Sequence, residues 1–278
     1  MKKYLFLCAF VAFLFASCSS KDEPKQMKEI TFNVAAFSVE QQPMNGPRRV
    51  PILDDNDGLS MTDLFVFDAG ELLVHQTNDQ QDFGVVTLTL EYGSHNLSFV
   101  ATRSDSPTVD GNLLKTNSLR PTFGKLQTVT VSDATDAFDI TLSRLTGQII
   151  ITFEDDIPAD AHHLVVQVET QYNHLNVTTF AGANAHEFNQ SVNIVARRGL
   201  SGERWTLNML TPIYGTAYTT DVSFAVYRQD DSLISRHSVE DVPICSNTKT
   251  LIHGAMFSGQ AFTVSANYTW EDDVDISW

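Results

Sequence analysis

The fold class of this chain can be inferred from the segment Val85-Val86-Thr87-Leu88-Thr89-Leu90-Glu91. Within it Val86, Leu88 and Leu90 alternate with Thr87, Thr89 and Glu91. Because successive side chains of a β-strand point to opposite faces, this period of two predicts a strand with one buried and one solvated face. An amphipathic helix would instead repeat its apolar residues three and four positions apart.

The same alternation recurs along most of the chain after residue 28. It is found at Ile30/Phe32/Val34, Val129/Val131, Phe138/Ile140/Leu142, Ile149/Ile151/Phe153, Leu164/Val166/Val168, Trp205/Leu207/Met209, Val222/Phe224/Val226 and Phe262/Val264/Ala266/Tyr268. Turn-forming sequences such as Asp68-Ala69-Gly70 and Gln229-Asp230-Asp231-Ser232 separate several of these runs. Short strands at this spacing are typical of β-sandwiches, and no segment has a long apolar stripe of helical period. We therefore expect an all-β, antiparallel sandwich fold with short peripheral helices at most.

A domain boundary is expected between residues 144 and 145. One strand pattern ends at Leu142, the segment Ser143-Arg144-Leu145-Thr146-Gly147 follows, and a new apolar strand begins with Gln148–Phe153. The resulting segments, 28–144 and 145–278, are of comparable size, and each has enough strands to build its own core. The sequence thus predicts two tandem β-sandwich domains.

The N-terminus has the features of an export signal. Lys2 and Lys3 precede an apolar run, Tyr4–Phe15, which is shorter than the roughly 20 residues needed to span a bilayer. Ala16-Ser17 then places small residues directly before Cys18, which resembles a bacterial lipobox, although Phe15 stands where leucine is usual. We expect residues 1–17 to be a signal peptide, Cys18 to carry lipid (palmitate), and residues 18–27 to be a flexible lipidated tether. The alternative is a plain signal peptide with an incidental cysteine.

The charge balance restricts the possible partners. The chain has 34 acidic and 18 basic residues, a net charge of −16 at pH 7. Such an acidic surface repels nucleic acid, and no basic patch with interleaved aromatic residues is present, so we expect no nucleic-acid partner. Of the three cysteines, Cys8 lies in the signal peptide and Cys18 is the expected acylation site. This leaves Cys245 without a partner for an intramolecular disulfide, and we expect it to be a buried thiol.

The sequence contains no recognisable motif for catalysis or cofactor binding. There is no G-x-S-x-G, no glycine-rich phosphate loop and no G-x-G-x-x-G. The eight histidines have no metal-ligand spacing, and the adjacent His162 and His163 would face opposite sides of a strand. Asp54-Asp55-Asn56-Asp57-Gly58 is similar to a calcium loop, but leucine stands at the first and twelfth positions, where acids are required. We expect no catalytic residues, no metal, no cofactor and no enzymatic activity.

Several short motifs, in this order and in a lipoprotein context, carry a family resemblance. They are Met61–Gly70, Tyr92–Ala101, Leu142–Leu145, Asp156-Ile157-Pro158, Asp241-Val242-Pro243, Asn247–Thr250 and Tyr268–Asp273. Together they resemble the FimB-like fimbrial anchor and minor-subunit family of Bacteroidetes, which belongs to the type V pilus. The resemblance covers nearly the whole chain after Cys18.

This resemblance implies two transthyretin-like sandwiches and a lipoprotein of the outer membrane, exposed on the cell surface. Lys21-Asp22-Glu23 fits the acidic surface-export signal of such lipoproteins. The implied partners are other fimbrial subunits, bound through β-strand edges or donor strands during cell adhesion. The outer membrane would be engaged through the lipid at Cys18. An alternative is a surface lipoprotein that binds glycan on an exposed aromatic platform, for which Trp205, Trp270 and Trp278 are the only tryptophans.

The resemblance also gives meaning to a basic pair behind the first strand. In stalk subunits of the family a protease cuts after an arginine at this place, which releases the first strand and opens a groove. Arg48-Arg49 stands in a Pro/Gly-containing segment, so it is a possible protease-sensitive loop. A solvated basic pair is the alternative that loop composition favours. Because cleavage would separate the body from its lipid, an anchor should keep the strand.

The C-terminal end offers a second candidate for strand exchange. Phe262–Trp270 alternates and is expected to be a structural strand. That would leave Glu271–Trp278, which is short for a donor strand.

Overall fold

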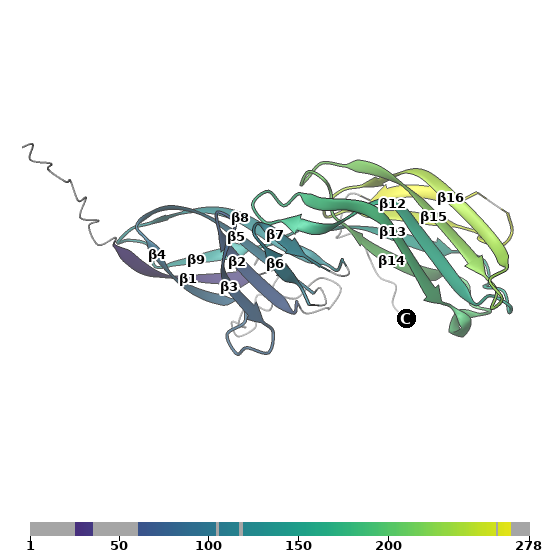
Figure 1. Ribbon diagram of the computed structural model, residues 1–278, viewed down its shortest axis with the longest axis horizontal. Coiled ribbons are helices and arrows are strands. Elements are labelled where there is room, and N and C mark those ends of the chain that lie inside the picture. The colour runs from purple at the N-terminus through teal and green to yellow at the C-terminus, as the bar shows by residue number, and fades with distance from the viewer. Residues whose placement is uncertain (1–25, 36–60, 104–105, 117–118, 260, 268–278) are drawn as a thin grey trace, which may run out of the picture.

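The computed structural model describes residues 26–35, 61–103, 106–116, 119–259 and 261–267. These residues form two β-sandwiches arranged end to end in an elongated molecule (Figure 1). The expected all-β fold is confirmed. Within the described ranges, no helix is long and apolar enough to cross a bilayer.

The first sandwich packs a three-stranded sheet against a five-stranded sheet. The three-stranded sheet has the order β4-β1-β9, with bounds Val85–Glu91, Met27–Ala35 and Ala137–Thr141. The five-stranded sheet has the order β10-β8-β5-β2-β3, with bounds Ser143–Arg144, Thr122–Val131, Gly93–Thr102, Asp63–Asp68 and Glu71–Thr77. Residues 85–91 therefore form an edge strand of the smaller sheet.

The second sandwich has the same layered construction. One sheet has the order β14-β11-β17-β18, with bounds Glu203–Met209, Gly147–Phe153, Lys249–Gly254 and Thr263–Asn267. The other contains β16 (Leu233–Ile244), β15 (Tyr218–Tyr227), β12 (His163–Asn176) and β13 (Gly182–Asn193), which pairs with β12. A short 3-10 turn, η2 (Val195–Arg197), joins β13 to β14.

Residues that alternate in the sequence lie alternately in the core and in solvent. In β4, Val86, Leu88 and Leu90 are buried, whereas Thr87 and Thr89 are exposed. Each sandwich has its own core of buried residues between its two sheets. Burial of apolar area at about 25 cal/mol per Å² is therefore the main stabilising contribution in both halves.

Each sandwich also contains one parallel strand pair. In the first, β1 runs parallel to β9, from Thr31 opposite Ala137 to Ala35 opposite Thr141. In the second, β11 runs parallel to β17, from Gln148 opposite Lys249 to Phe153 opposite Gly254. The other described pairs are antiparallel, as expected. The same arrangement thus occurs twice: the first strand of each half lies between one antiparallel and one parallel neighbour.

A short hairpin connects the two halves. Its strands, β6 (Thr108–Asp110) and β7 (Leu113–Lys115), lie in the sequence of the first half, yet β7 pairs with β12 of the second. A third cluster of buried residues lies at this junction: Phe65, Phe67, Val100, Leu114, Leu145, Leu175, Val177, Phe180 and Leu210. The two sandwiches therefore share a core at their junction, and the division of the sequence at residues 144/145 stays a prediction.

Candidate functional site

The first strand of the body, β1, is built into the middle of its sheet. It pairs antiparallel with β4, from Met27 opposite Glu91 to Asn33 opposite Val85, and parallel with β9. Its main chain therefore forms hydrogen-bond ladders on both sides. The amide of Val34 also donates to the carbonyl of Gly84, and that of Thr31 to Asp136. A central strand of this kind is held far more firmly than an edge strand.

The inner face of β1 supplies three side chains to the core. Ile30, Phe32 and Val34 are fully buried. The Phe32 ring packs against Phe99 of the opposite sheet, with centroids 5.3 Å apart, and stacks on Phe138 of β9 at 5.5 Å. Full burial of such a side chain contributes about 1.5–3 kcal/mol. The strand is thus part of the core and not an appendage to it.

The outer face of β1 is tied to both neighbours by polar contacts. Asn33 Nδ2 donates to Asp139 Oδ1 of β9 at 3.0 Å, and the hydroxyls of Thr31 and Thr87 lie 3.5 Å apart. At the start of the strand, on the same side as Ile30, Lys28 Nζ forms an ion pair with Asp136 Oδ1 at 3.0 Å. These contacts are solvated, so each contributes little to stability. Their effect is to fix the register of the strand.

The arrangement defines a groove that β1 occupies. Without β1, strands β4 and β9 would present unpaired backbone groups on either side of an apolar channel lined by Phe99 and Phe138. Such a channel is the type of site that accepts an extended strand from another chain. In this structure the chain's own strand fills it.

The C-terminal strand β18 has a weaker attachment. Among the described residues it pairs only with β17, antiparallel, from His253 opposite Thr263 to Lys249 opposite Asn267, and there it forms the edge of its sheet. The expected strand at Phe262–Trp270 is therefore confirmed over residues 263–267. The corresponding place beside β9 in the first sandwich holds no strand from the described part of the chain.

Two motifs that are not adjacent in the sequence lie side by side in the fold. The segments 61–70 and 92–101 contain β2 and β5, which are antiparallel neighbours. At one end of this pair, His95 Nδ1 lies 2.6 Å from Asp68 Oδ2, and His95 Nε2 lies 2.9 Å from the carbonyl of Glu91. Burial acts to lower the pKa of His95, but the Asp68 and Glu91 contacts outweigh it and raise that pKa above its ordinary value. Sequence spacing alone offered no signal for this contact.

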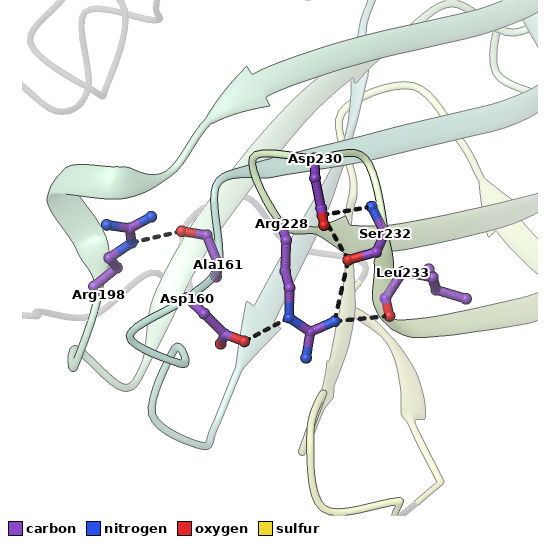
Figure 2. A network of polar contacts seen from close by, with 7 residues as sticks. All are labelled: Asp160, Ala161, Arg198, Arg228, Asp230, Ser232 and Leu233. Carbon is purple, nitrogen blue, oxygen red and sulfur yellow. Dashed lines mark hydrogen bonds and ion pairs between the residues drawn. The ribbon is translucent and has the colours of Figure 1, made fainter.

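The end of the second sandwich farthest from the junction is closed by a polar network (Figure 2). Arg228 Nε donates to Asp160 Oδ2 at 2.6 Å, which links the turn after β15 to the segment before β12. Ser232 donates its hydroxyl proton to Asp230 Oδ1, and Arg198 Nε donates to the carbonyl of Ala161. The hydrogen bond from Arg228 holds the pKa of Asp160 below its usual value. These contacts stabilise turns, and they bring no candidate catalytic group together.

The residues singled out from the sequence fall in two groups. Cys18, Arg48, Arg49, Trp270, Trp278 and the calcium-like segment 54–58 lie outside the described residues. Trp205 is described and is 8% exposed, with its ring centroid 4.6 Å from that of Phe153, so it belongs to the core. Cys245 is half-buried, where full burial was expected.

The histidines are engaged in structural contacts. His163 begins β12 and stacks on Tyr227, with centroids 5.1 Å apart, and both it and His162 are half-buried. Across the described ranges, no three His, Cys, Asp or Glu side chains form a group that could hold a metal ion.

Comparison with known proteins gives a likeness in fold and none in sequence. No family model and no curated protein matches the chain. A candidate adhesin from Bacteroides ovatus superposes with a TM-score of 0.50 at 7% identity, over 77% of this chain and 83% of that chain. A second candidate adhesin from Bacteroides ovatus gives 0.48 at 13% identity, over 91% and 97%. The fimbrial anchor protein Mfa2 from Porphyromonas gingivalis gives 0.49 at 11% identity, over 87% and 98%. The TM-score of 0.50 for the first structure supports a shared fold. The TM-scores of the other two are below 0.5, and no argument is based on them.

Proposed function

We propose that this chain is a lipid-anchored outer-membrane protein of a surface fimbria, either the anchor or a minor subunit. Lipid at Cys18 would hold it to the membrane, and β-strand edges would bind neighbouring pilins in cell-surface adhesion. The proposed role is structural and involves no catalysis. The observation that carries the proposal is that β1, which begins nine residues after Cys18, is a central strand of the first sandwich.

The position of β1 suits a connection that is under mechanical tension. A pull on the filament would reach the lipid through the N-terminal end of β1, along the direction of the strand. Two hydrogen-bond ladders and three fully buried side chains would resist that pull together, because sliding the strand by one residue turns its apolar side chains toward solvent. An edge strand would offer only one ladder.

The shared junction supports the same role. The β6–β7 hairpin pairs with β12, and Phe65 and Phe67 pack with Leu175 and Phe180 across the junction. A continuous core of this kind transmits force between the two halves without a flexible linker. We infer that the second sandwich presents the filament-facing end, with β18 as its accessible edge.

The proposal implies that the groove of β1 stays filled in the mature protein. If Arg48-Arg49 were cut, the lipid and β1 would remain together but would be held to the body without a covalent bond. An anchor therefore keeps this segment intact. A stalk or tip subunit that exchanges its first strand would have it cut.

Trp205 does not support the alternative of glycan binding on an exposed aromatic platform, because its side chain is buried against Phe153.

The experiment that tests the proposal is fractionation of cells that carry Cys18→Ala, with co-purification of the intact protein from the cell surface. Recovery of pilins supports the fimbrial role. Recovery of glycan without pilins would favour the alternative.

A further inference from the structure

A hollow of about 490 Å³ lies beside the junction of the two sandwiches. Its wall on the first sandwich is the outer face of β5 and β8, and its edge on the second is the turn after β12, which contributes Thr178. Hollows of this size at the meeting of two domains are common places for small ligands.

The register of β5 and β8 places four side chains on one face of the wall. Asn96 lies opposite Thr128, and Ser98 lies opposite Leu126. Thr128 Oγ1 donates to Asn96 Oδ1 at 3.0 Å, which holds the Asn96 amide in one orientation. Among the described residues, none accepts a hydrogen bond from the Nδ2 of Asn96. This amide can therefore donate to a ligand.

The other polar groups complete a set of neutral donors and acceptors. Ser98 is 2% exposed and lies on the lining of the hollow. Thr178 Oγ1 donates to Asn176 Oδ1 at 2.8 Å, so its lone pairs remain available to accept. The chain carries 34 acidic residues, but none of them is among the described residues that line the hollow. The site therefore suits a neutral ligand rich in hydroxyl groups and offers no charge to pair with an ion.

Leu126 supplies the apolar part of the site. It is 43% exposed, which leaves a large apolar surface in contact with water. Two residues earlier on β8, Gly124 is covered by the second sandwich, and a Cβ there would lie 2.7 Å from the Phe180 ring. Leu126 thus lies just beyond the covered part of the sheet. Sugars combine hydroxyl edges with an apolar C–H face, and an exposed leucine flanked by amide and hydroxyl groups complements both.

We propose that this junction hollow binds a neutral oligosaccharide, with Asn96, Thr128 and Thr178 as hydrogen-bonding residues and Leu126 as the apolar platform. The proposal goes beyond the fimbrial role, and it depends neither on the lipid at Cys18 nor on strand exchange. It also differs from an aromatic glycan platform, because no tryptophan takes part.

The test uses the full chain and a panel of neutral gluco-, manno-, galacto- and xylo-oligosaccharides of four to six sugars, with sulfated and sialylated glycans for comparison. The expected result is saturable binding of at least one neutral oligosaccharide, measured by calorimetry. Asn96→Ala should weaken it about 5- to 10-fold, as loss of one hydrogen bond implies, and Leu126→Asp should weaken it at least as much.

Ser191→Ala, an exposed position on β13, is the matched control and should bind as the unmodified chain does. Thermal unfolding of each variant separates loss of binding from loss of folding. The proposal is overturned if no neutral oligosaccharide binds at concentrations up to about 10 mM, above the range of useful weak affinities. Binding of charged glycans alone, or binding that Asn96→Ala and Leu126→Asp leave unchanged, would overturn it equally.

Discussion

The ring of Phe32 in β1 stacks on the ring of Phe138 in β9, with centroids 5.5 Å apart and planes inclined by 11°. The two strands run parallel, and the residues are register partners. The first strand after the tether is therefore joined to one of the last strands of the first sandwich. This contact anchors β1, the strand that follows the proposed lipidated tether, in the core of the first sandwich.

Truncation of the stacked ring should destabilise the first sandwich. We predict that Phe32→Ala lowers the free energy of unfolding by about 3–5 kcal/mol, because it removes a fully buried aromatic side chain and leaves a cavity. Thr31→Ala, on the solvated face of the same strand, should cost about 0.5 kcal/mol or less. Urea denaturation of both variants measures the difference. Equal effects of the two substitutions would contradict the assignment of β1 to the core.

Cleavage behind β1 should leave the strand in place. We predict that a specific protease site in place of Asn45–Arg49 can be cut without release of the N-terminal peptide under native conditions. The strand is retained by its two ladders and three buried side chains. Native mass spectrometry of the cut protein measures retention. The same cut made in Phe32→Ala should release more peptide, and immediate release from the unmodified chain would argue against a permanently filled groove.

The close approach at the junction gives a prediction for Gly124. A Cβ at this position would lie 2.7 Å from Phe180 Cζ and 2.8 Å from Leu145 Cδ1. Gly124→Ala should therefore overpack the junction and destabilise the protein by about 1–3 kcal/mol. Combining it with Phe180→Leu should cost less than the sum of the two single substitutions, because the smaller side chain relieves the contact. Strict additivity in a double-mutant cycle would show that the two halves do not meet as described.

The pair formed by His95 and Asp68 should make stability depend on pH. The pKa of His95 is raised in the folded state, so the pair adds stability that is fully present below the unfolded pKa of about 6.5. That stability is lost as pH rises through the higher folded pKa. Melting temperatures between pH 5 and 8 should therefore fall less steeply for His95→Gln than for the unmodified chain. Identical pH profiles would rule out a stabilising role for the charged pair.

Sequence periodicity was a good guide to which residues face the core. The alternations at Ile30/Phe32/Val34 in β1 and Val86/Leu88/Leu90 in β4 are confirmed as buried faces. Alternation of apolar residues shows which face of a strand is buried, but it does not show which strand lies beside it. The parallel pairing of β1 with β9 could therefore not be derived from the sequence. The same limit applies to β11 and β17 in the second sandwich.

The elements that sequence analysis missed lack a clear apolar period. The hairpin strands β6 and β7 are three residues each, too short for alternation to be seen. Strand β13, Gly182–Asn193, is almost entirely polar or small and is defined by its pairing with β12. The contact between His95 and Asp68 and the junction hollow depend on three-dimensional neighbours. The sites derived from motifs, at Cys18 and Arg48-Arg49, stay predictions.

We propose above that lipid at Cys18 holds this protein in the outer membrane as part of a fimbria. The most direct test of this proposal is membrane fractionation of cells that produce Cys18→Ala, followed by microscopy of their fimbriae. We predict that the variant leaves the membrane fraction and that fimbrial attachment or length changes. Membrane retention equal to that of the unmodified protein would contradict it.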